Sequence, residues 1–176
     1  MPTRLPADLA PALAALRASC DRYLARAETL SPDRWCQPIG EGKWSPAQIS
    51  EHVRLSYAVI GHELATGSGG LPLKVPRWLR PWLRFKYFGK ILRTGRMPVG
   101  ARAAREISPR GSSFDQESTL AGLRDAAWAL EAAVASRWDD PEAGFSHHVF
   151  GRVSLSDGWR FAIVHTDHHT RQLPGG

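Results

Sequence analysis

The helical signal that decides the fold is the stretch SPAQISEHV at residues 45–53. Ser45 followed three positions later by Gln48 forms a capping box, in which each side chain satisfies a free backbone N–H at a helix start. Pro46 stands at the first helical position, where its fixed backbone angle suits the helix and its missing N–H costs no hydrogen bond. The pattern predicts a helix that begins here and runs to the glycine-rich break at residues 67–70.

Three further stretches carry apolar residues at the three- and four-residue spacing of helices that bury one face. They cover residues 9–27, residues 113–138, where Ser113 and Gln116 form another capping box, and residues 155–173, which follow Ser154. Alternating patterns typical of strands are scarce, and residues 149–155 form the best of them, so at most a token strand is expected. We therefore predict an all-α fold, a four-helix bundle with a long crossover between helices 2 and 3, as a single domain over residues 1–176.

The composition is that of a soluble globular protein, because 43% of the 176 residues are hydrophobic and 23% are charged. No apolar run approaches the roughly 18–20 residues that a membrane span needs. Asp8 and Arg17 interrupt the Ala/Leu-rich N-terminal stretch, which makes it a poor signal peptide. Cys20 and Cys36 show neither metal-ligand nor redox spacing. We therefore expect a cytoplasmic protein with no membrane span.

The predicted crossover, residues 67–112, is basic and rich in aromatic residues. It holds eleven Lys and Arg against one acid, Glu106, which gives it a charge of +10 in a chain whose net charge is +6. Basic residues beside Trp and Tyr can serve a nucleic acid or an anionic membrane surface. The third interpretation is a cap over one end of the bundle, with Trp and Phe packed inward. We favour the cap and expect no nucleic-acid partner.

The chemistry of the chain is concentrated in three histidines. His165 and His169 are four residues apart, so on a helix their side chains lie on one face, one turn apart, and can share one divalent metal ion. His52, on the predicted second helix, is the candidate third ligand. Each also has a simpler interpretation, with His52 as a hydrogen-bonded core residue and the pair as part of a solvated helix face. Three buried imidazoles without a shared partner would leave ring nitrogens unsatisfied, which favours the metal site.

Three motifs resemble those of one known family. KWSPAQISEHV at residues 43–53 resembles the WS-x-x-x-[IL]-x-x-H-[LV] opening of helix two in the DinB-like (YfiT-type) metal-binding superfamily. HVFGRVSLSDGW at residues 148–159 resembles that family's HPxFGxLSxxxW lead-in to helix four, and HTDHHTRQL at residues 165–173 its HxxHHxxQL signature. The motifs come in the order of the family, and the resemblance covers the chain from about residue 5 to residue 173.

The resemblance implies a bundle whose metal ion is held by His52, His165 and His169. Three neutral histidines leave coordination positions open for water or substrate, as in a catalytic metal site, and zinc, nickel, iron and manganese all accept imidazole. Characterised relatives include thiol-dependent transferases and isomerases that use bacillithiol, mycothiol or glutathione. The resemblance therefore implies a metal-dependent enzyme acting on small molecules, with thiol S-transferase-like chemistry and a low-molecular-weight thiol as cofactor.

Two alternatives stay open beside the transferase. A non-catalytic metal-binding protein for stress or detoxification would use the site without turnover, and a metal-dependent hydrolase would activate water there. For the transferase, we expect the open face of the ion to look into a pocket roofed by residues 67–112, with arginines on its rim. The chain stops three residues after Leu173, where many relatives continue, so we expect any C-terminal contribution to be missing or to come from a partner chain. A homodimer is possible.

The four remaining histidines receive no ligand role. His168 is rotated by about 100° from His169 on an ideal helix and is expected at the surface or behind the ligands. His62 is expected to be solvated. His148 matches a position of the family motif and is expected to order the turn before the last helix, whereas His147 is read as a loop residue without a role.

Overall fold

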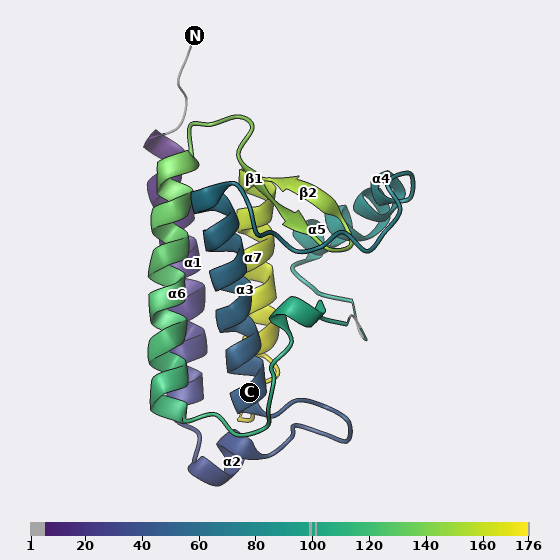
Figure 1. Cartoon of the computed structure of the whole chain (residues 1–176). Helices are drawn as coiled ribbons and strands as arrows, with labels where there is room; N and C mark the ends of the chain where they lie inside the picture. Colours follow the sequence, from purple (N-terminus) through teal and green to yellow (C-terminus); the bar gives the residue numbers. More distant parts are fainter. Residues whose placement is uncertain (1–5, 99, 101, 176) are drawn as a thin grey trace.

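Four long helices form the body of the protein in a computed structural model that describes residues 6–98, 100 and 102–175 (Figure 1). They are α1 (Pro6–Glu28), α3 (Pro46–Thr66), α6 (Gln116–Arg137) and α7 (Leu155–Thr170), and the short α2 (Pro32–Cys36) lies between α1 and α3. α3 packs along α6, and α1 packs on α7 and α6. The predicted four-helix bundle with a long crossover between its second and third helices is confirmed. Within the described residues, no helix is long and apolar enough to span a bilayer.

The core of the bundle also fixes the rotation of the two helices that carry the site. The Tyr57 hydroxyl of α3 is fully buried and shares a hydrogen bond with the Thr166 hydroxyl of α7. The Trp159 Nε1 donates to the carbonyl of Ala12 on α1 at 2.8 Å. Because Thr166 follows His165 in the chain, these contacts set which way the last turns of α7 face. His52, in the same row as buried core residues of α3, faces the same interior.

The sequence predicted the N-terminal cap correctly for two of the three helices α3, α6 and α7. The capping box of α3 is present, with Gln48 N–H donating to Ser45 Oγ at 3.3 Å and Ser45 N–H donating to Gln48 Oε1 at 3.0 Å. Ser154 caps α7 as expected. The capping box predicted at residues 113–116 is wrong, because α6 is capped by Asp115, whose carboxylate accepts from Ser118 N–H at 2.8 Å. A carboxylate at this position also interacts favourably with the helix dipole.

A short hairpin leads into α7 and is more regular than the token strand that the sequence suggests. β1 (Gly144–His147) pairs antiparallel with β2 (Gly151–Ser154) in the register Gly144↔Ser154 to His147↔Gly151. Phe145 and Val153 from its inner face belong to a small second apolar cluster that also holds Phe161 of α7. The hairpin therefore fixes the point at which α7 begins, about three turns before His165 and about four before His169.

The crossover lies beside α3 and α7, on the side away from α1 and α6 (Figure 1). It contains α4 (Arg80–Leu83), the π-helical turn η1 (Arg84–Phe88), α5 (Gly89–Thr94) and the 3-10 turn η2 (Arg105–Ile107). Phe88 is buried, and its ring stacks on Phe161 of α7. The prediction that the aromatic residues pack inward is wrong for most of them, since Trp78, Trp82 and Phe85 are 79%, 50% and 88% exposed. A short segment that packs on the bundle through Phe88 and Ile91 buries that one face and leaves the other to solvent.

Candidate metal centre

The two adjacent helices α3 and α7 bring the three predicted ligands together. His52 lies in the second turn of α3, and His165 and His169 lie in the last turns of α7. One side-chain nitrogen from each ring lies within 4.8 Å of the others, which makes the three residues a cluster able to hold one metal ion. Residues 113 positions apart in the sequence thus meet at one point.

The ring nitrogens converge on a common centre. The His165 Nε2 lies 3.1 Å from the His52 Nε2 and 3.1 Å from the His169 Nε2. The ring planes cross at 71°, 77° and 86°, so the rings meet edge to edge rather than stack. Two nitrogens that each lie about 2.1 Å from one ion, at tetrahedral or octahedral angles, are themselves about 3.0–3.4 Å apart. The observed spacing fits that arrangement.

The outer ring nitrogens decide where the imidazole protons lie. The His52 Nδ1 donates to the carbonyl oxygen of Ile107 in η2 at 2.7 Å, and the His169 Nδ1 donates to the Gln172 Oε1 at 2.7 Å. A neutral imidazole carries one proton, so the Nε2 of each of these rings presents a lone pair to the centre. His165 can supply at most one Nε2 proton for two facing lone pairs. A bound cation satisfies all three nitrogens at once.

Burial keeps the three rings in the neutral form that a metal ion requires. Burial lowers the pKa of His52 below its usual value. Burial, reinforced by the neighbouring His52, lowers the pKa of His169 to about 3. The pKa of His165 is held well below its usual range by burial and by the adjacent His169 and His52. Neutral imidazoles are the protonation state that coordinates metals, and the donor set therefore fits a divalent ion.

His165 is the least buried of the three histidines. His52 and His169 are 3% and 7% exposed, whereas His165 is only half-buried. The Phe161 ring lies parallel to the His165 ring with centroids 6.0 Å apart, and the Trp44 ring lies 5.1 Å from that of His52. Aromatic walls of this kind lower the local dielectric, and three protein ligands leave positions for a further ligand.

The histidines without a predicted ligand role stay outside the cluster. His168 is half-buried, and its Nε2 accepts from the Gln172 Nε2 at 3.1 Å. His62 is exposed, as expected. The expected turn-ordering role belongs to His147 and not to His148, because the His147 Nδ1 accepts from the backbone N–H groups of Val149 at 3.2 Å and Phe150 at 3.4 Å. Burial lowers the pKa of His147 to about 3, which suits this acceptor role.

Two contributors to the site were missed in the sequence. Gln172 stands three residues after His169, at helical contact spacing, and this position was the signal that could have identified it. Ile107 contributes through its backbone carbonyl, which leaves no signature in the residue type. Cys20, by contrast, is a core residue as predicted, and burial raises the pKa of its thiol to about 12.

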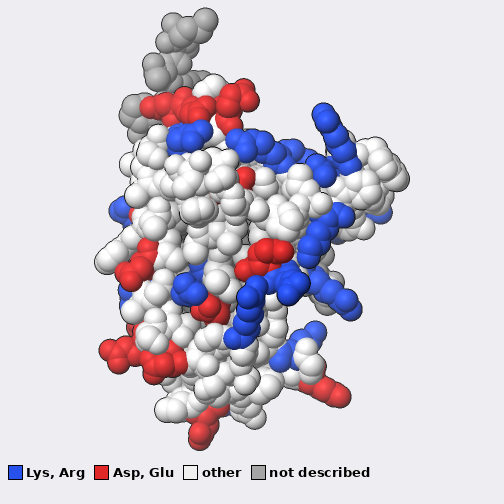
Figure 2. Space-filling model, viewed as in Figure 1, with Lys and Arg blue, Asp and Glu red and all other residues white. Residues whose placement is uncertain are grey.

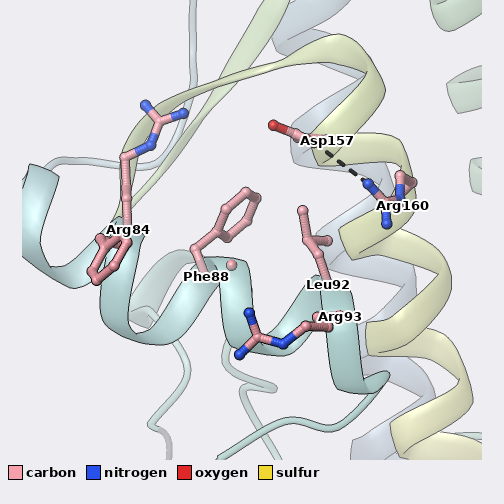
Figure 3. A pocket seen from close by; sticks show the side chains of 8 residues that line it. Arg84, Phe88, Leu92, Arg93, Asp157 and Arg160 are labelled. Carbon is pink, nitrogen blue, oxygen red and sulfur yellow. Dashed lines mark ion pairs between the residues drawn. The ribbon is translucent and has the colours of Figure 1, made fainter.

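The arginine-rimmed pocket expected over the metal centre lies elsewhere. A cavity of about 650 Å³ is lined by crossover residues that include Arg84 and Arg93 and by Asp157 and Arg160 of α7 (Figure 3). None of the three clustered histidines lines this cavity. The crossover touches the cluster through Ile107 instead. The expected cap is therefore corrected in part: the crossover adjoins the site, but the two of its arginines that line the cavity, Arg84 and Arg93, lie beside the first turns of α7.

Comparison with known proteins places the chain in a family. The family model described as the DinB superfamily matches residues 15–173. The solved structure of TT2238, a four-helix bundle protein, shares 25% identity and a TM-score of 0.59, over 96% of this chain and 99% of that one. YfiT from Bacillus subtilis, described as a probable metal-dependent hydrolase with an unusual four-helix bundle topology, shares 13% identity and a TM-score of 0.61, over 96% of this chain and 85% of that one. No curated protein matches the chain. Since the family model spans nearly the whole sequence, the protein belongs to the DinB superfamily.

Proposed function

We propose that the protein is a metal-dependent enzyme that acts on small molecules, with His52, His165 and His169 as the ligands of one divalent ion. Zinc is the first candidate, and nickel, iron and manganese also accept imidazole ligands. The observation that carries the proposal is the convergence of three neutral Nε2 atoms at 3.1 Å spacings, two of them fixed as lone pairs by the bonds of their Nδ1 atoms.

The most suitable chemistry is transfer of a low-molecular-weight thiol such as bacillithiol, mycothiol or glutathione to an electrophile. A divalent ion supplies Lewis acidity and lowers the pKa of a thiol or water that reaches it. Within the described residues, the cluster that could hold an ion contains three imidazoles and no carboxylate. Both nucleophiles must lose a proton, but a thiol, with an ordinary pKa of about 8.5, ionises far more readily than water, with a pKa of about 15.7, so a thiol at the ion needs less help from a base. This difference favours the thiol.

The residues around the cluster have defined roles in this proposal. The bonds to Ile107 and Gln172 hold His52 and His169 in one ring orientation, which preserves the donor geometry. Phe161 and Trp44 exclude water beside the rings. In this proposal a thiol and its electrophile would approach at His165, the least buried of the three residues.

Hydrolysis at the same site is the second candidate. The probable metal-dependent hydrolase YfiT has the same fold. An ion at this site would lower the pKa of a bound water molecule, as it would lower that of a thiol. The third outcome is a protein that binds metal for stress or detoxification without turnover.

Metal analysis of the purified protein, followed by paired activity assays, tests the proposal. We expect about one equivalent of divalent metal in the unaltered protein, a sharp loss in His169→Ala and no change in His62→Ala, because His62 is exposed and outside the cluster. If the His169→Ala variant retained its metal content, the proposed site would be refuted.

The activity assays separate the three candidate functions. Glutathione, bacillithiol and mycothiol are each offered with chlorodinitrobenzene, and p-nitrophenyl acetate is offered without thiol. Thiol consumption that depends on metal and stops on chelation supports the transferase. Metal-dependent ester cleavage without thiol favours the hydrolase, and stoichiometric metal without turnover in either assay favours the non-catalytic protein.

A further inference from the structure

The exposed large apolar side chains of the protein are concentrated on the crossover. Within the described residues, seven such side chains are exposed, and four of them fall in the stretch 78–87. They are Trp78, Trp82, Phe85 and Tyr87, with exposed fractions of 79%, 50%, 88% and 37%. This stretch forms α4 and η1, which project from the bundle at the right of Figure 1. We refer to residues 76–94 as the aromatic tip.

The aromatic tip is also strongly basic. It contains six basic residues and no acid, and none of the six forms an ion pair with any described residue. The six are Arg77, Arg80, Arg84, Lys86, Lys90 and Arg93. Lys86 lies 4.6 Å from the centroid of the Trp82 ring, so charge and aromatic surface occupy the same few residues. Figure 2 shows Lys and Arg side chains on the upper right of the molecule, around the position of this projection.

The cavity beside the aromatic tip adds a place for an anion. Its floor is formed by the buried Phe88 and the half-buried Leu92, and three guanidinium groups stand around it (Figure 3). Arg84 donates one N–H to the carbonyl of Arg152 at 2.7 Å, which fixes its direction. Arg160 is held only loosely by Asp157, at 3.9 Å. Arg93 completes the set. A guanidinium group pairs bidentately with phosphate oxygens, so each of the three is a suitable partner for a phosphate group.

We propose that the aromatic tip docks the protein on an anionic phospholipid membrane surface, with Trp78, Trp82 and Phe85 entering the interface and Arg84, Arg93 and Arg160 binding lipid phosphates. Trp and Phe beside Lys and Arg are the combination that stabilises peripheral segments at the level of the headgroups. A projecting tip suits a planar interface. A second copy of the same surface would bring like charges together, which disfavours self-association.

A nucleic acid is the rival partner with complementary charge. Single strands, however, are held in grooves where successive bases stack on aromatic rings. Phe85 is among the residues that line the cavity, whereas the exposed Trp78, Trp82 and Tyr87 are not. The arrangement therefore favours the membrane surface.

Co-sedimentation of the full-length protein with lipid vesicles tests the proposal. Vesicles of phosphatidylcholine alone are compared with vesicles containing equal parts of phosphatidylcholine and phosphatidylglycerol. We expect binding only to the mixed vesicles and a marked decrease at high salt, because salt screens the attraction. Arg84→Glu and Arg93→Glu should each lower the partition coefficient at least about fivefold, the contribution of one basic residue near an anionic surface.

Matched variants distinguish the tip from the rest of the surface. Trp78→Ala combined with Phe85→Ala should also release the protein, whereas Trp128→Ala, at a side chain of α6 that is 67% exposed, should not. Arg34→Glu on α2, outside the tip, is the control for the change of charge and should leave vesicle binding unchanged. His169→Ala should bind vesicles like the unaltered protein, because docking does not depend on the metal centre. Circular dichroism confirms that each variant is folded.

Four results would overturn the proposal. Equal binding to both kinds of vesicle would show that charge plays no part. Loss of binding in Trp128→Ala equal to that in the tip variant would show that the tip is not the contact. Binding of an oligothymidylate through Arg84 and Arg93 without binding to vesicles would identify a nucleic-acid surface, and displacement from vesicles by an equal concentration of inorganic phosphate would identify a site for small anions.

Discussion

Gln172 is the residue whose substitution separates ring orientation from metal ligation. Its Oε1 accepts the Nδ1 proton of His169, which leaves the Nε2 lone pair of that ring facing the centre. We predict that Gln172→Ala weakens metal affinity about 10–100-fold, as is typical when a group that orients a histidine ligand is lost. Gln172→Glu keeps an acceptor and should retain most of the affinity. Competitive titration against a chromophoric chelator measures both values.

His168→Ala is the matched control for Gln172. His168 accepts from the other end of the same amide and lies outside the cluster, so we expect the metal affinity of this variant to match that of the unaltered protein. An equal loss in both variants would show that the whole last turn of α7 holds His169, and not the acceptor alone.

At the residue scale, helical spacing predicted which side chains meet but not what orients them. His165 and His169 share a face because the helix repeat places them one turn apart, and His52 follows from its place on the buried row of α3. The partner of His52 is a backbone carbonyl 55 residues away, which no side-chain pattern reveals. Assigning the turn to His148 failed because the role depends on where β1 ends: His147 is its last residue and its Nδ1 reaches the N–H groups that follow, whereas His148 already belongs to the turn.

Among the elements, the β1–β2 hairpin depends on close backbone contact at Gly144. A Cβ atom at this position would lie 2.1 Å from the Val153 carbonyl oxygen, which belongs to the paired strand and cannot move without loss of the ladder. We predict that Gly144→Ala lowers the free energy of unfolding by about 1–3 kcal/mol, the usual cost of overpacking. Urea denaturation followed by circular dichroism measures the change.

Gly89→Ala is the control for that substitution and should have the opposite sign. Gly89 begins α5, and a Cβ atom there would meet only the Arg84 carbonyl oxygen at an ordinary 3.8 Å. Alanine loses less backbone entropy than glycine in a helix, so we expect a gain of about 0.5–1 kcal/mol. Destabilisation by both variants to the same extent would contradict the argument from backbone contact.

The long helices were predictable and the smaller elements were less so, for reasons of packing. The capping box at Ser45 acts locally, so sequence alone located the start of α3. β1 carries no alternating pattern and is stabilised by Phe145 packing into a cluster with residues from the crossover and α7. The inward packing expected for Trp78, Trp82 and Phe85 failed because residue type does not state which face of a short helix meets the bundle.

On the scale of the whole molecule, the histidine cluster joins three parts of the chain. His52 belongs to α3, His165 and His169 belong to α7, and the bond from His52 to Ile107 adds the crossover. The Tyr57–Thr166 hydrogen bond ties α3 to α7 next to the cluster. An ion bound by the three rings therefore bridges segments that must separate when the protein unfolds.

This bridging predicts that metal raises the stability of the entire bundle. A ligand at 100 times its dissociation constant stabilises the native state by about 2.7 kcal/mol, which corresponds to a rise in Tm of about 5–10 °C for a chain of this size. We expect differential scanning calorimetry to show this rise when zinc is added to protein stripped with a chelator. The rise should persist in His62→Ala, whose side chain is exposed, and disappear in His165→Ala, which removes the ligand shared by both 3.1 Å contacts. A Tm that is the same with and without zinc in the unaltered protein would show that the three nitrogens do not bind zinc, because binding to the native state alone must stabilise it.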